Sequence, residues 1–187
     1  QLLFFPLAVH SARAPLRSPF IVDIYMRPEM PGHIVDASFL PCKSGDKPVL
    51  LVLQQMSSLP IGHAKEVRHT FSVTALSIDA TRKASAVMWR HVGLPHDCIR
   101  LLSLKNSALG RKGVLLIAEN AVLFVSADGC AGLATNGFAA VTVEEHVPLQ
   151  PWPYKVGMEL DASVWAQVGP MELVASLKDG RLLRLSL

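Results

Sequence analysis

Short aliphatic segments follow one another along most of the chain, and polar turns separate them. The segments are rich in Val, Ile, Leu and Phe, and Gly, Pro, Asn and Asp gather at their ends. This pattern is typical of β-strands, and no long stretch has the apolar spacing of an amphipathic helix. The sequence therefore predicts an all-β fold.

The segments recur in a fixed order. The first type occurs as HIVDASFL from His33, DCIRLLSL from Asp97 and ELDASVWAQ from Glu159, with starts 64 and 62 residues apart. A second and a third segment follow each of these. They are PVLLVLQQ and VRHTFSVTALSID, then GVLLIAEN and AVLFVSADG, and finally MELVASLKDG and RLLRLSL. The first copy has a fourth segment, ASAVMWRHV, and we expect the fourth segment of the second copy near GFAAVTVEEHV, from Gly137.

A period near 63 residues with three or four antiparallel strands predicts the elaborated blade of a WD40-like β-propeller, whose standard blades repeat at roughly 40 to 45 residues. Blade packs on blade because a twisted sheet exposes two apolar faces that must both be covered. The stretch KGVLLIAENAVLFVSADG, Lys112 to Gly129, is then a hairpin buried on both faces.

The whole chain, 1–187, reads as a segment of one propeller domain. Residues 1–26 would supply the outer strands of one blade, 33–92 and 97–146 would each form a blade, and 158–187 would give three strands of a further blade. About three blades are fewer than the roughly four to eight that close a propeller, so we expect the rest of the ring elsewhere in a longer polypeptide. The absence of an initial Met agrees with that expectation.

Charge and cysteine content narrow the class of protein. The formal charge of +3 is spread over 18 basic and 15 acidic residues, so no strongly basic face for nucleic acid is visible. The odd count of Cys42, Cys98 and Cys130 favours a reducing, intracellular compartment.

The opening QLLFFPLAVHSARAP imitates a signal peptide, but we interpret it as a strand and a loop. No apolar stretch reaches the roughly 18 residues that predict a membrane-spanning helix.

Motifs that would indicate catalysis are weak. A match to S-x-x-K, Ser44 to Lys47, lies in a predicted turn, and the sequence has no phosphate-binding or dinucleotide-binding glycine motif. His91 precedes the cluster His96-Asp97-Cys98, but no paired ligand motif supports zinc, so we interpret them as loop residues. Asp36 and Asp161 occupy matching positions of two copies, where they are expected to tie turns and strand ends. We expect no cofactor and no metal.

Two surface features are candidates for contact with a partner or RNA. The loop from Lys105 to Lys112, with Arg111, could contact phosphate, although such loops are more often solvated turns. The proline-rich stretch QPWPY offers Trp152 and Tyr154 as outward-facing aromatics. The other tryptophans, Trp89 and Trp165, are expected in the core.

The stretch TALSIDATRKASAVMWRHVGLPHDCIRLLSL, 74–104, resembles the first β-propeller of the largest subunit of the cleavage and polyadenylation specificity factor (CPSF). The resemblance is in pattern and order, with a strand ending in Val-Met-Trp and then Leu-Pro-His-Asp-Cys leading into the next blade. It continues through GVLLIAENAVLFVS, GLATNGFA, PFIVDIY, HIVDASFL and LVASLKDGRLLRLSL. The loop 105–112 departs from the family because it is longer and less proline-rich, which puts local surface contacts in doubt.

The resemblance implies a nuclear, non-catalytic scaffold of the pre-mRNA 3′-end cleavage and polyadenylation machinery. It implies as partners the zinc-finger CPSF subunit, the WD-repeat CPSF subunit and the CPSF nuclease subunits, with pre-mRNA contacted mainly through the complex. It implies neither a membrane nor a small-molecule substrate. Two alternatives share the fold, namely an adaptor of a damaged-DNA-binding ubiquitin-ligase complex and a subunit of a branch-site splicing complex. An enzyme built on a propeller is a third.

Overall fold

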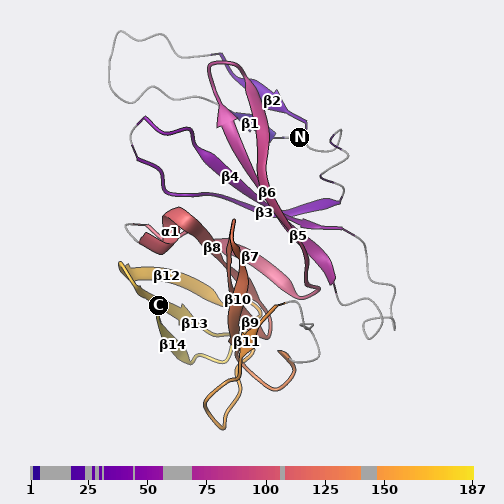
Figure 1. Ribbon diagram of the computed structural model, residues 1–187. Coiled ribbons are helices and arrows are strands. Elements are labelled where there is room, and N and C mark those ends of the chain that lie inside the picture. The colour runs from indigo at the N-terminus through magenta and orange to yellow at the C-terminus, as the bar shows by residue number, and fades with distance from the viewer. Residues whose placement is uncertain are drawn as a thin grey trace.

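The computed structural model describes residues 2–4, 18–23, 27, 30, 32–43, 45–56, 69–105, 108–139 and 147–187. Within them the fold is nearly all β, with several antiparallel sheets and one short helix, as Figure 1 shows. The predicted all-β class is confirmed, and the sheets are consistent with part of a propeller-like domain. No helix in this described part is long and apolar enough to cross a membrane.

A small sheet near the N-terminus joins β1 (Leu2–Phe4) to β2 (Phe20–Val22) in antiparallel register. The ring of Phe4 stacks on that of Phe20 at a centroid distance of 5.1 Å. Both strands fall within the predicted QLLFFPLAV and SPFIVDIYM segments. The remaining residues of those two segments lie largely outside the described part of the chain.

The next sheet contains β3 (His33–Phe39), β4 (Val49–Gln55), β5 (His69–Asp79) and β6 (Ala84–Pro95), in sequence order and antiparallel throughout. The turn between β5 and β6 forms because Oδ1 of Asp79 accepts the backbone N–H groups of Thr81 and Arg82.

A second large sheet contains β7 (Cys98–Leu102), β8 (Gly113–Ala118), β9 (Ala121–Ser126) and β10 (Gly129–Ala134), also in sequence order. The helix α1 (Ala108–Lys112) connects β7 to β8. At the outer edge, β11 (Leu149–Gln150) pairs with β10 in parallel.

The last sheet contains β12 (Val164–Gly169), β13 (Glu172–Ser176) and β14 (Leu182–Ser186). Its strands are antiparallel, with Ala175 opposite Leu183 in the β13–β14 pair. The turn between β13 and β14 contains Gly180, whose φ of 85° is one that glycine adopts without strain.

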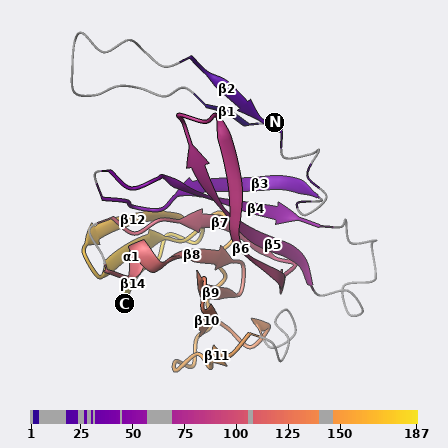
Figure 2. The same cartoon turned by 45° about the horizontal axis from the view of Figure 1, so that its top comes forward.

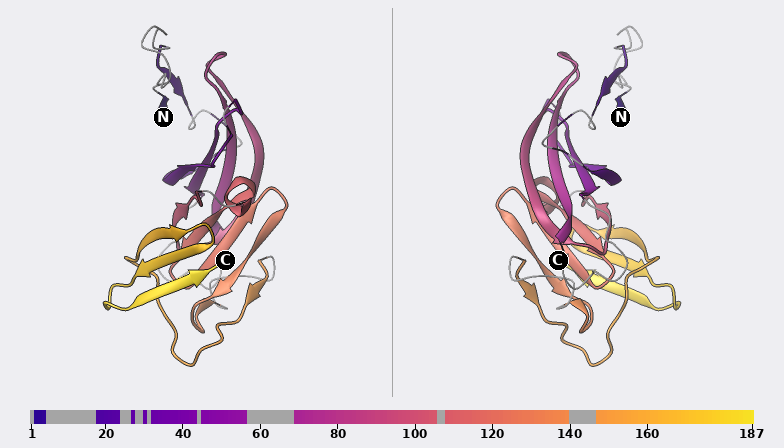
Figure 3. Two further views of the ribbon diagram at one scale, coloured as in Figure 1. Left: turned by 90° about the vertical axis from the view of Figure 1, so that its left-hand side faces the viewer. Right: turned by 90° about the vertical axis from the view of Figure 1, so that its right-hand side faces the viewer.

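Among the described residues, three hydrophobic cores lie between four sheets, which are stacked in sequence order. One core joins β1 and β2 to the β3–β6 sheet, a second joins that sheet to the β7–β11 sheet, and a third joins the β7–β11 sheet to β12–β14. Figure 2 and Figure 3 show this order, with β1–β2 and β12–β14 at opposite ends of the molecule. Each inner sheet therefore buries both faces.

The β8–β9 hairpin illustrates this double burial. Leu116 and Leu123 pack into the core toward the β3–β6 sheet, whereas Leu115 and Val122 pack into the core toward β12–β14. Because neighbouring residues of a strand point to opposite faces, burial on both sides requires a continuous apolar sequence. The predicted hairpin from Lys112 to Gly129 is confirmed.

The fourth strand of the second copy was expected too late in the sequence. It is β10, which pairs directly with β9 through the short turn at 127–128. Of the GFAAVTVEEHV stretch, residues 137–139 follow β10 outside any strand, and 140–146 lie outside the described residues. The other strand-forming segments of the three copies are confirmed, whereas their grouping into propeller blades stays a prediction.

Candidate partner-binding surface

An apolar groove lies beside β14. Two adjoining hollows of ≈ 480 Å³ and ≈ 590 Å³ share Val122, Leu133, Leu185 and Ser186 as lining residues. We call their union the β10–β14 groove. Strands β9 and β10 supply one wall, β14 supplies another, and the segment 148–158 closes the far side. Its further apolar lining is Leu115, Phe124, Leu149, Trp152, Val156, Met158 and Leu183.

The aromatic loop at the mouth of the groove holds Trp152 and Tyr154, two of the predicted contact residues. Trp152 is half-buried against the core below β12–β14, and its Nε1–H donates to the backbone oxygen of Val156 at 2.8 Å. Tyr154 is 69% exposed and meets the Trp152 ring edge-on at a centroid distance of 5.1 Å. The indole thus anchors the loop, and the phenol faces solvent.

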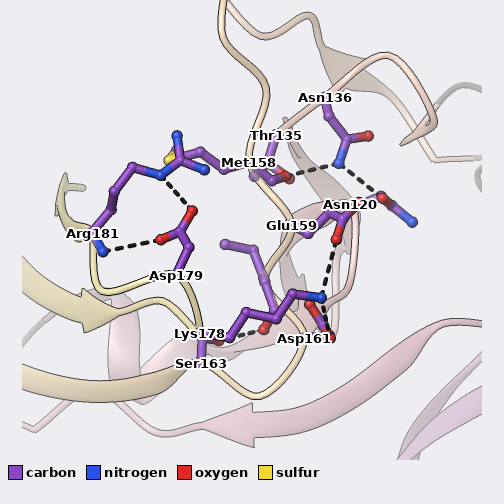
Figure 4. A network of polar contacts seen from close by, with 11 residues as sticks. Asn120, Thr135, Asn136, Met158, Glu159, Asp161, Ser163, Lys178, Asp179 and Arg181 are labelled. Carbon is purple, nitrogen blue, oxygen red and sulfur yellow. Dashed lines mark hydrogen bonds and ion pairs between the residues drawn. The ribbon is translucent and has the colours of Figure 1, made fainter.

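A network of uncharged polar groups fixes the base of this loop (Figure 4). The side-chain amide of Asn136 donates to Oδ1 of Asn120 and to the backbone oxygen of Met158, both at 2.8 Å. The hydroxyl of Thr135 donates to the same Met158 oxygen at 2.9 Å. The network therefore ties the β8–β9 turn and the end of β10 to the segment that leads into β12.

Charged groups flank the network in the same view. Lys178 donates to Asp161 at 2.8 Å and to Glu159 at 3.2 Å, and these two hydrogen bonds raise the pKa of the ammonium group. Arg181 pairs with Asp179 at 2.6 Å. The pKa of Asp179 is lowered because its carboxylate accepts hydrogen bonds from the backbone and side chain of Arg181. The β13–β14 turn is thereby held to the segment before β12.

Glu119 lies beside this cluster, in surroundings that disfavour its charged form. Burial raises its pKa above the ordinary value of 4.5, and the nearby carboxylates of Asp97 and Asp161 raise it further. The imidazole of His96 opposes the shift. The backbone oxygen of Glu119 accepts the N–H of Leu160 at 2.8 Å, which joins the β8–β9 turn to the segment before β12.

The predicted cationic candidates lie on a different element. Lys105 follows β7 and is exposed, but its backbone N–H and C=O are both bound by the side-chain amide of Gln167, at 2.6 and 2.7 Å. Arg111 and Lys112 occupy the last turn of α1 and are exposed. Figure 1 and Figure 2 place α1 away from β11 and the aromatic loop, so the structure does not join the basic and aromatic candidates into one site.

The residues weighed as zinc ligands were expected to be loop residues, but this is right only for His96 and Asp97, because His91 lies in β6 and Cys98 in β7. Asp97 is buried and accepts a hydrogen bond from the Asn120 amide at 2.9 Å. Cys98 is buried in β7, and burial raises the pKa of its thiol well above the ordinary value. The imidazole of His91 is hydrogen-bonded to the backbone oxygen of Ser126 at 2.5 Å. Among the described residues, no group of three His, Cys, Asp or Glu side chains could hold a metal ion.

The two aspartates at matching positions of the sequence have different contacts, Asp36 within β3 to a backbone group and Asp161 to a side chain. Asp36 accepts the N–H of Leu101 on the next sheet at 2.7 Å, and Asp161 pairs with Lys178. Asn120 and Asn136, which shape the loop, were not among the candidate residues of the sequence. Asn-Ala and Asn-Gly steps in polar loops signal turns, and nothing in the sequence shows that two such turns meet.

The chemistry of the groove suits binding. Its lining is mainly aliphatic and aromatic, and the charged residues at its rim, Arg181 and Arg184, pair with Asp179 and Glu172. An apolar trough with a few polar groups at the edge can receive aliphatic side chains of another polypeptide segment.

Comparison with known proteins gives a relative. No protein-family model matches the chain. Over 156 residues the chain is 31% identical to cleavage and polyadenylation specificity factor subunit 1 of Arabidopsis thaliana. The match covers 83% of this chain and 10% of the relative, so the chain spans about a tenth of the length of that protein. The resemblance noted in the sequence is thus borne out, and the chain belongs to the family of cleavage and polyadenylation specificity factor subunit 1, of which it matches one segment.

Proposed function

We propose that this chain is a segment of a non-catalytic scaffold subunit that acts in pre-mRNA 3′-end cleavage and polyadenylation. The observation that carries the proposal is the 31% identity to subunit 1 of the cleavage and polyadenylation specificity factor over most of the chain. The site of action would be the nucleus, because 3′-end processing takes place there. The partners would be the zinc-finger, WD-repeat and nuclease subunits of CPSF, with pre-mRNA contacted mainly through the complex.

The architecture supports a scaffold role. Sheets packed face to face by continuous apolar cores form a rigid body, and such a body presents loops and strand edges at fixed positions. The chemistry of the described part also supports it, because the charged side chains around Lys178 and Arg181 are engaged in structural pairs.

Within this role we assign contact with partners to two surfaces. The aromatic loop with Trp152 and Tyr154 suits a protein partner, because Tyr154 offers an exposed ring that Trp152 and the Asn136 network hold in place. The exposed cations Lys105, Arg111 and Lys112 suit phosphate, although their separation from the aromatic loop makes this a distinct contact.

Affinity purification of the full-length protein from its own cells at moderate salt, followed by mass spectrometry, tests the proposal. We expect recovery of a zinc-finger protein, a WD-repeat protein and nucleases of the 3′-end machinery. Recovery of cullin components would favour the damaged-DNA adaptor instead, and recovery of branch-site splicing components would favour the splicing subunit. Either result would overturn the function and leave the fold intact.

Variants of the full-length protein then test the two surfaces. Tyr154→Ala should reduce recovery of one protein partner and leave the others unchanged. A Lys105→Glu, Arg111→Glu and Lys112→Glu triple variant should reduce RNA crosslinking to the complex. Lys43→Glu, an exposed cation on the loop between β3 and β4, is the matched control for charge.

A further inference from the structure

A separate hollow of ≈ 380 Å³ lies between the aromatic loop and the end of β10. Its lining begins with Ala134, the last residue of β10, and ends with Gly157 in the loop. Among the described residues no part of β14 contributes to this lining, so the edge of β14 has no influence on its shape. We call it the loop hollow.

Two aromatic rings line the loop hollow in fixed positions. Trp152 and Tyr154 meet edge-on at a centroid distance of 5.1 Å, and the indole N–H of Trp152 is bonded to the loop backbone. The chain is also held on both sides of the rings, by the pairing of Leu149–Gln150 with β10 and by the Asn136 network. A proline precedes each ring and restricts the backbone further. A site that is preorganised in this way loses little conformational freedom when a ligand binds.

Three polar side chains of the loop hollow have no hydrogen-bond or ion-pair partner in the described part of the chain. They are the amide of Gln150, the hydroxyl of Tyr154 and the ammonium group of Lys155, and all three residues are exposed. The other polar side chains of the lining, Asn136 and Trp152, are already engaged. None of the described lining residues is acidic, so the loop hollow carries a positive charge and an excess of donors.

The angled rings suit the ring of a proline. Their planes are 65° apart, so together with Ala134 and Leu149 they form an angled apolar surface and not a flat platform. Proline rings pack into aromatic-lined grooves of this kind. In an extended polyproline II segment the carbonyl oxygens have no internal hydrogen bonds and can accept from Tyr154 and Gln150. Proline also has no N–H that would need an acceptor in the site.

The charge pattern favours a protein over a nucleic acid. Within the described residues Lys155 is the one cation that lines the loop hollow, and the nearby cations Lys178, Arg181 and Arg184 are paired with carboxylates. A nucleic-acid strand needs a track of free cations along its backbone. One unpaired ammonium group suits a single carboxylate instead.

We propose that the loop hollow binds an extended, proline-containing segment of a protein partner, with an acidic residue beside the proline that pairs with Lys155. The proposal rests on the protein contact assigned above to the aromatic loop and names the chemistry of that partner.

Binding of a labelled peptide to the purified full-length protein tests the proposal. The probe has one aspartate followed by six prolines, and the control peptide has alanines in place of the prolines. Fluorescence anisotropy should show about tenfold tighter binding of the proline peptide, since the alanine peptide lacks both the ring and the extended conformation. Equal affinity for the two peptides would overturn the proposal.

Ring variants place the binding at the loop hollow. Tyr154→Ala should abolish the preference for the proline peptide. Phe138→Ala is the matched control, because Phe138 is 67% exposed, close to the 69% of Tyr154, but does not line the loop hollow. The control should keep the preference, and a preference that survives Tyr154→Ala would contradict the proposed site.

A charge cycle tests the role of Lys155. With asparagine in place of its aspartate, the proline peptide should bind the parent protein about three- to fivefold more weakly. Lys155→Ala should weaken the aspartate peptide by a similar factor and leave the asparagine peptide unchanged. If asparagine weakens binding equally in Lys155→Ala, the carboxylate pairs elsewhere and the proposed pairing is wrong.

A labelled single-stranded RNA octamer separates the two classes of ligand. RNA binding that falls in both Tyr154→Ala and Lys155→Ala, with equal affinity for the two peptides, would assign the loop hollow to a nucleotide and overturn the proposal. All of these measurements use the isolated full-length chain, so they can fail while copurification still supports the function proposed above. Copurification with cullin or splicing components would refute that function and leave the measured peptide affinities as they are.

Discussion

Leu101 donates its backbone N–H to the carboxylate of Asp36 at 2.7 Å, although the two residues lie 65 positions apart. Ser38 and Ser103, also 65 apart, share a hydrogen bond of 2.6 Å, and Lys105 is bonded to Gln167 over a separation of 62. These separations are close to the interval at which the strand pattern repeats. The first strands β3 and β7 of the two large sheets therefore lie side by side, as we expect of the inner strands of neighbouring propeller blades.

The Asp36 contact predicts a loss of stability on substitution. Asp36→Ala should lower the free energy of unfolding by about 1.5–3 kcal/mol, because hydrogen bonds to charged groups contribute in that range and the Leu101 N–H loses its acceptor. Asp36→Asn keeps an acceptor oxygen and should lower it by less. Denaturant unfolding of the two variants measures the difference. Equal losses in both would mean that the negative charge, rather than the acceptor, matters.

Glu119 should make the folded protein less stable as the pH rises. Its pKa in the folded protein is raised by burial and by Asp97 and Asp161, so the fold favours the protonated carboxyl. The folded state then holds more protons than the unfolded state between pH 4.5 and the raised pKa, and stability decreases through that window. Glu119→Gln removes the penalty, so its melting temperature should exceed that of the parent by a margin that grows with pH.

Thermal unfolding of Glu119→Gln from pH 4.5 to pH 8 checks this dependence. The control is Asp128→Asn, which removes the same charge from the exposed turn between β9 and β10 of the same sheet. A margin that stays constant over the whole pH range, or one that the control reproduces, would contradict an effect specific to Glu119.

Asp79 should have the opposite effect on the pH dependence, because it stabilises the fold less as the pH falls, and it should act at a lower pH. Its pKa is lowered from 3.8 to about 2, because the carboxylate accepts the Arg82 N–H, then bonds Lys47, and also accepts the Thr81 N–H. A lowered carboxyl pKa gives stability that is present above pH 3.8 and is lost as the pH falls through about 2. Asp79→Ala should therefore lower the melting temperature at pH 7, and the difference should shrink toward pH 2. Asp79→Asn keeps an acceptor for the turn, so its melting temperature at pH 7 should lie between those of the parent protein and of Asp79→Ala.

Strands buried on both faces were predictable because their apolar runs are continuous. The β8–β9 hairpin follows from its sequence alone, whereas β10 does not, since GCAGLA has few of the β-branched and aromatic residues that indicate strands. Small residues are needed there. A Cβ on Gly132 would lie 2.4 Å from the backbone oxygen of Val122, so β10 can approach β9 only with glycine at this position.

The candidate surface was predictable in part. The aromatics of QPWPY indicated an exposed loop, and Tyr154 is exposed, but the inward anchoring of Trp152 depends on a core that three distant segments build. The groove itself has no sequence signal, because β9, β10 and β14 contribute to it from separate copies of the repeat. The stacking of successive sheets brings these segments together, and their local patterns are ordinary strand patterns.

Gly157 predicts that a single methyl group can loosen the aromatic loop. A Cβ at Gly157 would lie 2.7 Å from the Cβ of Asn136, so Gly157→Ala must move the loop away from the Asn136 network. Overpacking of this kind costs about 1–3 kcal/mol, and here it acts on the segment that carries Trp152 and Tyr154. Gly137→Ala is the matched control, because Gly137 also adjoins Asn136 but has open space where the Cβ would go.

Lys155 lies at the tip of the loop and is exposed, so trypsin cleavage after Lys155 reports on local opening. Gly157→Ala should be cut severalfold faster than the parent protein, and Gly137→Ala at the parental rate. Equal cleavage of all three would show that the Asn136 contact does not hold the loop.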